Sequence, residues 1–92
     1  MNGHRYKAAP KFWRNFKKLT AAQKDSVRAV WQIFKRDPFD PRLRTHKIHR
    51  LSAAYGTTVY AVEIERDLRA VFYIEADIVF TLDIGTHDVY RG

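Results

Sequence analysis

Four ionisable residues in the second half of the chain have the types needed for phosphate chemistry. Arg69 lies between Glu63 and Asp83 in the sequence, and His87 follows Gly85 near the C-terminus. A guanidinium can bind two phosphate oxygens through its planar fork, and a histidine can transfer protons near neutral pH. Such a set suits the binding or cleavage of a phosphodiester. The alternative is a solvated charge ladder with a bystander histidine.

From Thr57 onward, apolar residues alternate with a period of two, and this pattern predicts the strands that position these groups. Apolar residues alternate with other residues over three segments, 59–64, 68–74 and 78–84. The short stretches 65–67 and 75–77 are interpreted as three-residue hairpin loops. We therefore expect an antiparallel meander, with Gly85 permitting a sharp exit that leaves His87 near the end of the sheet.

Side-chain parity fixes which residues of this meander share a face. A hairpin that keeps its apolar residues on one face can change register only in steps of two. Glu63, Arg69 and Asp83 then form one cross-strand row on the less apolar face. The expected pairs are Ile64 with Leu68, Glu63 with Arg69, Ile74 with Ile78, and Arg69 with Asp83.

Helical periodicity predicts two amphipathic helices before the meander. Pro10 opens the first, and Thr20 with Gln23 forms a capping box at the start of the second, which ends at Asp37-Pro38. We interpret their apolar stripes as core rather than as base-stacking surfaces. The stripes comprise Phe12, Trp13, Phe16 and Leu19, and then Val27, Val30, Trp31 and Phe34.

The connection between helices and meander is expected to be a loop followed by a short strand. Two prolines predict the loop over residues 37–42, and residues 46–51 could be a short, basic strand. The fold class predicted is α+β, with two N-terminal helices packed on one face of an antiparallel β-sheet. With 92 residues, we expect a single domain over 1–92.

Charge and composition narrow the classes of partner. Seventeen Lys and Arg against ten Asp and Glu give a formal charge of +7, which favours nucleic acid as a partner. A solvated basic surface or a docking face for an acidic protein are the alternatives. No cysteine is present, and the histidine spacing does not suggest a metal site, so we expect no cofactor and no metal. The lack of a long apolar run or signal-peptide core leads us to expect a cytoplasmic protein without membrane contact.

The order of these motifs resembles the RelE/ParE toxin superfamily of type II toxin–antitoxin systems, over nearly the whole chain. The stretch Asp67-Leu-Arg-Ala-Val-Phe72 resembles the family's arginine-bearing strand. The strand Ile78-Val-Phe-Thr-Leu-Asp-Ile84, followed by Gly85-Thr-His-Asp88, resembles its terminal isoleucine-glycine-x-histidine element. His46-Lys-Ile48 resembles the histidine-x-leucine segment of the YafQ- and YoeB-like members. The RelE/YoeB/YafQ-like branch implies a RelE-like microbial RNase-type fold and an mRNA interferase.

The resemblance also implies roles for individual residues. Arg69 takes the phosphate-binding position and His87 the catalytic histidine position. Tyr90 stands near the family's terminal aromatic, one residue closer to His87 than in YafQ-like members. Asp67 matches an acidic position, whereas Glu63 stands where those members often have histidine. This departure leaves the general base open between Glu63 and His46.

The implied activity is ribosome-dependent cleavage of mRNA without a metal, which inhibits translation. The base would activate a ribose 2′-hydroxyl, His87 would protonate the leaving oxygen and Arg69 would stabilise the phosphorane. Tyr90 would stack on a base or orient His87. The implied partners are mRNA, the ribosome and an acidic antitoxin encoded next to the toxin. Phosphate contacts are expected from Arg42, Arg44, Lys47, His49 and Arg50.

Two other readings remain open. A ParE-like toxin would inhibit DNA gyrase without cleaving RNA, although ParE-like members generally lack the histidine that His87 supplies. An inactive relative would bind its antitoxin only. His87 is the sequence feature that favours the endoribonuclease.

Overall fold

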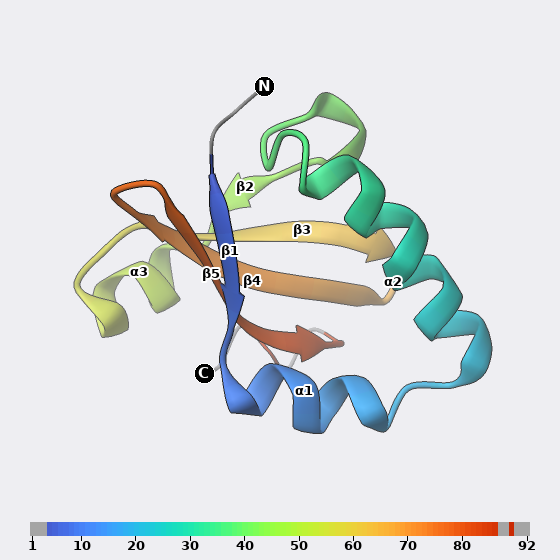
Figure 1. Ribbon diagram of the computed structural model, residues 1–92. Helices are drawn as coiled ribbons and strands as arrows, with labels where there is room; N and C mark the ends of the chain where they lie inside the picture. Colours follow the sequence, from blue (N-terminus) through green and yellow to red (C-terminus); the bar gives the residue numbers. More distant parts are fainter. Residues whose placement is uncertain (1–3, 87–88, 90–92) are drawn as a thin grey trace.

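The structure is a computed structural model that describes residues 4–86 and residue 89. Five strands form one sheet in the order β1-β5-β4-β3-β2, with helices packed against it, which confirms the α+β class (Figure 1). No helix in the described part of the chain is long and apolar enough to span a bilayer. In chain order the elements are β1 (Arg5–Ala8), α1 (Pro10–Lys17), α2 (Ala21–Phe34), η1 (Pro41–Leu43), β2 (His46–Lys47), α3 (His49–Tyr55), β3 (Val59–Glu65), β4 (Leu68–Glu75) and β5 (Ile78–Gly85).

Helices α1 and α2 begin where their sequence signals predict. Pro10 occupies the first helical turn of α1, where its missing N–H is not needed. The Thr20 hydroxyl accepts the Gln23 backbone N–H at 3.1 Å, and the Gln23 side chain accepts the Thr20 N–H at 2.9 Å. The predicted capping box is therefore confirmed.

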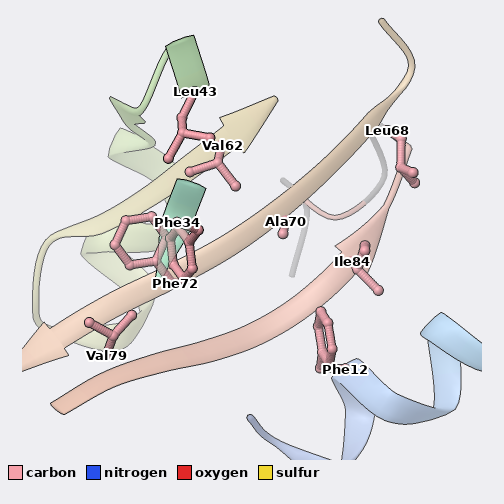
Figure 2. Close-up of a cluster of buried hydrophobic side chains, with 9 residues drawn as sticks. All are labelled: Phe12, Phe34, Leu43, Val62, Leu68, Ala70, Phe72, Val79 and Ile84. Carbon is pink, nitrogen blue, oxygen red and sulfur yellow. The ribbon is translucent and has the colours of Figure 1, made fainter. Parts of the chain in front are cut away.

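The main hydrophobic core lies between these two helices and one face of the sheet (Figure 2). Phe34 of α2 packs edge-on against Phe72 of β4, with ring centroids 5.0 Å apart. Phe12 of α1 lies beside Ile84 of β5 in the same cluster. The expectation that both helices cover one face of the sheet is confirmed. From β4, the side chains of Leu68, Ala70 and Phe72 point into this core.

A third helix covers part of the opposite face and corrects the strand expected at 46–51. Only His46 and Lys47 pair with β3, and α3 begins at His49. Leu51 of α3 is buried in a second cluster with Val59, Ala61, Val71 and Val89. Gly56 ends the helix with φ at +69°, a conformation that glycine adopts without strain. Burial of Leu51 outweighs the weak period-two pattern of this segment.

The sheet is mixed rather than wholly antiparallel, because it contains a parallel N-terminal strand that the sequence did not predict. Strand β1 pairs in parallel with β5, with Tyr6 opposite Val79. Four residues carry too little alternation to be recognised in the sequence, yet Tyr6 and Ala8 pack against the main core while Arg5 and Lys7 are exposed. The N-terminal segment is thus part of the fold.

The predicted register of the meander is right in one place and wrong in three. Glu63 pairs with Arg69 as expected, across a bulge at Ile64. Both hairpin turns contain two residues rather than three, so Leu68 pairs with Glu65 and Ile74 with Val79. A bulge at Leu82 then shifts β5, so that Arg69 faces Gly85, and Asp83 faces Val71.

Candidate active site

Arg69 and Glu63 form the centre of the candidate site, on the face of the sheet turned away from α1 and α2. Arg69 alternates with the core-facing residues Leu68 and Ala70, which fixes this face. Its Nη2 lies 3.6 Å from Glu63 Oε1. Its Nη1 donates to the carbonyl oxygens of Glu65 and Arg66, each at 2.6 Å. The guanidinium thus braces the β3–β4 turn and orients its second nitrogen toward a carboxylate.

The side chain of Arg69 is only 12% exposed, and that of Glu63 is 29% exposed. Partial burial weakens the competition from water and strengthens an arginine–carboxylate interaction. A phosphate could reach this guanidinium only at its exposed edge. The two side chains at the centre of the site are therefore partly buried rather than fully open to solvent.

His46 lies on the same face, on the next strand. It pairs with Ala61, and Ala61 and Glu63 are alternate residues of β3 that point the same way. His46 and Glu63 are therefore diagonal neighbours across β2 and β3. His46 Nδ1 lies 2.9 Å from the Arg44 carbonyl oxygen, which can only accept a hydrogen bond. In the neutral imidazole this bond places the proton on Nδ1 and the basic lone pair on Nε2.

Two described residues near the C-terminus, Gly85 and Val89, lie on the face that carries Arg69. Gly85, two residues before His87 in the sequence, is paired with Arg69. The Val89 N–H donates to the Thr86 carbonyl at 3.0 Å, and Val89 is buried on the same face as Arg69. His87 and Tyr90 themselves lie outside the described residues, so their predicted roles stay predictions.

Two acidic residues of the predicted set lie elsewhere than in the Arg69 row. Asp67 occupies the exposed β3–β4 turn. Asp83 was expected opposite Arg69, but this is wrong because the two-residue β4–β5 turn and the bulge at Leu82 together place it opposite Val71. Asp83 is 7% exposed and its carboxylate accepts from Asn15 at 2.6 Å and from the Ile84 N–H at 2.8 Å, with Lys11 Nζ at 3.4 Å. It ties β5 to α1.

The predicted phosphate-binding residues are all exposed, but they do not form one row. Four of them lie on three short elements, η1, β2 and α3, and Arg44 directly follows η1. Arg42 binds Asp40 in a fork, through Nε at 3.0 Å and Nη2 at 2.9 Å. These side-chain hydrogen bonds lower the pKa of the Asp40 carboxyl to about 2 and raise the pKa of Arg42. Lys47 pairs with Tyr60 and so faces the side opposite His46.

A large apolar cleft on the α1–α2 side was not predicted. It measures about 520 Å³ and is lined mainly by side chains of the two helices and the sheet beneath them. Trp13 and Trp31, assigned to the core from the sequence, are 51% and 39% exposed at this cleft. The sequence signal that could have indicated this cleft is the large number of aromatic residues on the two helical stripes, more than one face of a small sheet can bury. Among the described residues, no group of three His, Asp or Glu lies close enough to hold a metal ion.

Comparison with known proteins identifies the fold. The sequence matches no family model and no curated protein. Among solved structures, a chain of the archaeal RelE–RelB complex from Pyrococcus horikoshii superposes with a TM-score of 0.71 at 14% identity, covering 91% of this chain and 94% of that one. YafQ from E. coli gives 0.70 at 12% identity, covering 97% and 99%. A YoeB/ParE toxin from Agrobacterium tumefaciens gives 0.70 at 11% identity, covering 90% and 98%.

These likenesses run over nearly the full length of both chains. They include the sheet, whose β3–β4–β5 meander carries Glu63 and Arg69. The chain therefore has the fold shared by RelE, YafQ and YoeB/ParE.

Proposed function

We propose that this protein is the toxin of a type II toxin–antitoxin system, and that it inhibits translation by cleaving mRNA on the ribosome. The observation that carries the proposal is the Glu63–Arg69 pair on the sheet face away from α1 and α2, in a fold shared with YafQ and RelE. His46 on the adjacent strand supplies a second proton acceptor beside that pair. The net charge of +7 suits an RNA substrate.

The reaction proposed is an internal transesterification that needs no external nucleophile. A base, Glu63 or His46, removes the proton from a ribose 2′-hydroxyl, and the oxygen attacks the adjacent phosphorus. The bond to the 5′-oxygen breaks, and His87 supplies the proton that this leaving oxygen takes. The products are a 2′,3′-cyclic phosphate and a 5′-hydroxyl end. Each proton transfer contributes about 10²- to 10⁴-fold to the rate.

Arg69 would stabilise the negative charge that develops on the phosphorane. Its Nη1 is used by the turn carbonyls, so the phosphate would meet Nη2, where Glu63 now lies. A phosphate arriving there displaces the Glu63 carboxylate from its ion pair. Substrate binding would thereby release the base next to the 2′-hydroxyl that it must deprotonate.

The partner proposed for the other face is an acidic antitoxin. DinJ and RelB accompany the similar folds in their complexes. The cleft between α1 and α2 has a volume of about 520 Å³ and mainly apolar walls, with exposed tryptophans. An amphipathic segment with acidic flanks would bury this surface and complement the charge of +7.

Expression of variants in bacteria, with mapping of RNA ends, tests the cleavage proposal. Wild type should arrest growth and leave 5′-hydroxyl ends, whereas His87→Ala and Arg69→Ala should do neither. Matched controls are His4→Ala and Arg66→Ala, which change the same residue types outside the proposed site. Equal arrest by wild type, His87→Ala and Arg69→Ala would refute catalysis by these residues.

A second candidate is a non-catalytic toxin that inhibits DNA gyrase. The 12% exposure of Arg69 and its use in the turn favour it, because both are expected of a structural arginine. Purified protein would then block DNA supercoiling while leaving RNA intact in a translation reaction. An inactive relative would do neither and would only bind the antitoxin.

A further inference from the structure

Three aromatic side chains lie in a row on the face that carries Arg69, toward the β4–β5 turn. Tyr73 of β4 and Phe80 of β5 are directly paired, with ring centroids 5.1 Å apart and an interplanar angle of 27°. Tyr55, the last residue of α3, continues the row, 6.4 Å from Tyr73 and tilted by 38°. These rings come from three different elements yet form one surface.

This row differs from the aromatic core on the other face of the sheet. Phe72 and Phe34 are 0% and 5% exposed, so their rings are sealed. Tyr55 is 51% exposed, and Tyr73 and Phe80 are half-buried. Aromatic surface that stays in water beside a packed core is available to a ligand with flat, stackable groups.

Basic side chains flank the row at the sheet edge. Lys7 of β1 is exposed and pairs with Phe80, and alternation along β1 places it on the same face, because Tyr6 and Ala8 turn toward the main core. Arg5, two residues before Lys7 on the same face of β1, is exposed and forms an ion pair with Asp77 at 3.4 Å. A cation beside stacked rings is the pattern of single-stranded nucleic-acid binding surfaces.

The row lies on the same face of β4 as the candidate active site, with Val71, buried beneath Leu51 of α3, between them. Tyr73 and Arg69 point the same way from one strand and are four residues apart, which corresponds to about 13 Å. A few nucleotides of one RNA strand can cover that distance. Base pairing would hide the faces of the bases, so the surface suits unpaired RNA and not a duplex.

We propose that Tyr55, Tyr73 and Phe80, with Lys7, form a stacking platform that binds unpaired bases of RNA next to the cleavage site. This inference rests on the proposed function in taking RNA as the ligand, but it concerns a separate set of residues. The platform would hold the strand while Arg69 engages the phosphate.

Equilibrium binding of a short 2′-O-methyl oligoribonucleotide tests the platform, because this probe cannot be cleaved by 2′-hydroxyl attack. Tyr55→Ala should weaken binding at least about fivefold, the loss expected for one stacked base. Phe39→Ala is the matched control, since Phe39 is 45% exposed and packs against Tyr60 and Phe72 on the other face. The same oligonucleotide with abasic residues should not distinguish Tyr55→Ala from wild type. Tyr73→Leu keeps apolar bulk and should also weaken binding to the intact probe.

The charge contribution is tested by salt titration. Lys7→Gln should reduce the slope of log affinity against log salt by about one, whereas Lys17→Gln should not. Wild-type affinity in Tyr55→Ala, an equal loss on the abasic probe, or tighter binding of duplex RNA would each overturn the platform.

Parallel cleavage of unmodified RNA separates this inference from the proposed function. If wild type cleaves RNA and Tyr55→Ala binds normally, the platform is wrong and the nuclease stands. If wild type binds the probe through Tyr55 but cleaves nothing, the platform stands and the nuclease is wrong.

Discussion

Arg69 and Glu63 face each other across β4 and β3, with Nη2 3.6 Å from Oε1, while Nη1 of the same guanidinium donates to two carbonyls of the β3–β4 turn. One side chain therefore links the shape of a hairpin to the position of a carboxylate. Any change at Arg69 should alter stability and chemistry together. A change at Glu63 should alter the chemistry with little effect on stability.

Arg69→Lys tests this link. An ammonium on a flexible stem cannot reproduce a rigid fork that reaches both turn carbonyls and the carboxylate. We expect a loss of about 1–3 kcal/mol in the free energy of unfolding, because two hydrogen bonds from a charged group to the turn carbonyls are lost. Thermal denaturation should show a midpoint lower by about 4–8 °C for each kcal/mol. RNA cleavage should fall about 100-fold or more.

Arg66→Lys is the control, since Arg66 is exposed in the same turn and contributes its main-chain carbonyl only. It should leave both measurements near wild type. An unchanged melting midpoint in Arg69→Lys would show that the turn does not depend on the guanidinium.

Glu63→Gln and His46→Ala together identify the general base. Glutamine keeps the shape of Glu63 but cannot take up a proton, and the pair it belongs to is partly solvated, so stability should change by less than about 1 kcal/mol. If Glu63 is the base, single-turnover cleavage should fall about 10²- to 10⁴-fold in Glu63→Gln and little in His46→Ala. The reverse pattern would assign the role to His46, whose Nδ1 contact to the Arg44 carbonyl leaves Nε2 as the basic atom. Full activity in both variants would exclude each as the base.

The pH dependence of the Arg42–Asp40 pair gives another prediction. Hydrogen bonds from Arg42 lower the pKa of the Asp40 carboxyl from 3.8 to about 2. Because the folded pKa is depressed, the pair's contribution to stability is complete above about pH 4 and is lost as the pH falls through about 2. Carbon NMR titration of the Asp40 carboxyl should show this low midpoint, and Arg42→Ala should return it toward 3.8. A midpoint unaffected by Arg42→Ala would mean that the ion pair does not form in solution.

Features that depend on neighbouring residues were predicted correctly from the sequence, whereas the pairing of distant strand residues was predicted only in part. The Thr20–Gln23 capping box and the Pro10 start depend on residues within one helical turn, so composition and spacing suffice to identify them. Glu63 opposite Arg69 was also predicted, and a bulge at Ile64 keeps this pair despite the shorter turn. Parity failed further along because two-residue turns replaced the expected three, and the bulge at Leu82 then returned Ile84 to the core-facing side. Two compensating shifts leave the hydrophobic pattern intact while moving Asp83 away from Arg69.

The elements missed altogether are short and are stabilised by distant contacts. Strand β1 has four residues and exists through its pairing with β5, at the other end of the chain. Helix α3 has seven residues and depends on Leu51 being buried against Val59, Ala61 and Val71. Helices this short have little intrinsic stability, so tertiary packing decides their conformation. The row of Tyr55, Tyr73 and Phe80 could not be predicted from the sequence for the same reason, since Tyr55 reaches Tyr73 only because α3 packs on the sheet.

Gly56 controls where α3 ends and therefore how Tyr55 is presented. Its φ of +69° lies in the left-handed region, and an added Cβ would meet no atom within 4 Å, so any cost of substitution is backbone strain alone. Gly56→Ala should lower the free energy of unfolding by about 1 kcal/mol, whereas Gly56→Asn should cost less, because asparagine tolerates this conformation better. Urea denaturation of the two variants measures the difference. Equal costs for alanine and asparagine would point to a steric or packing origin instead of strain, and would place the end of α3, with Tyr55, in a different backbone conformation.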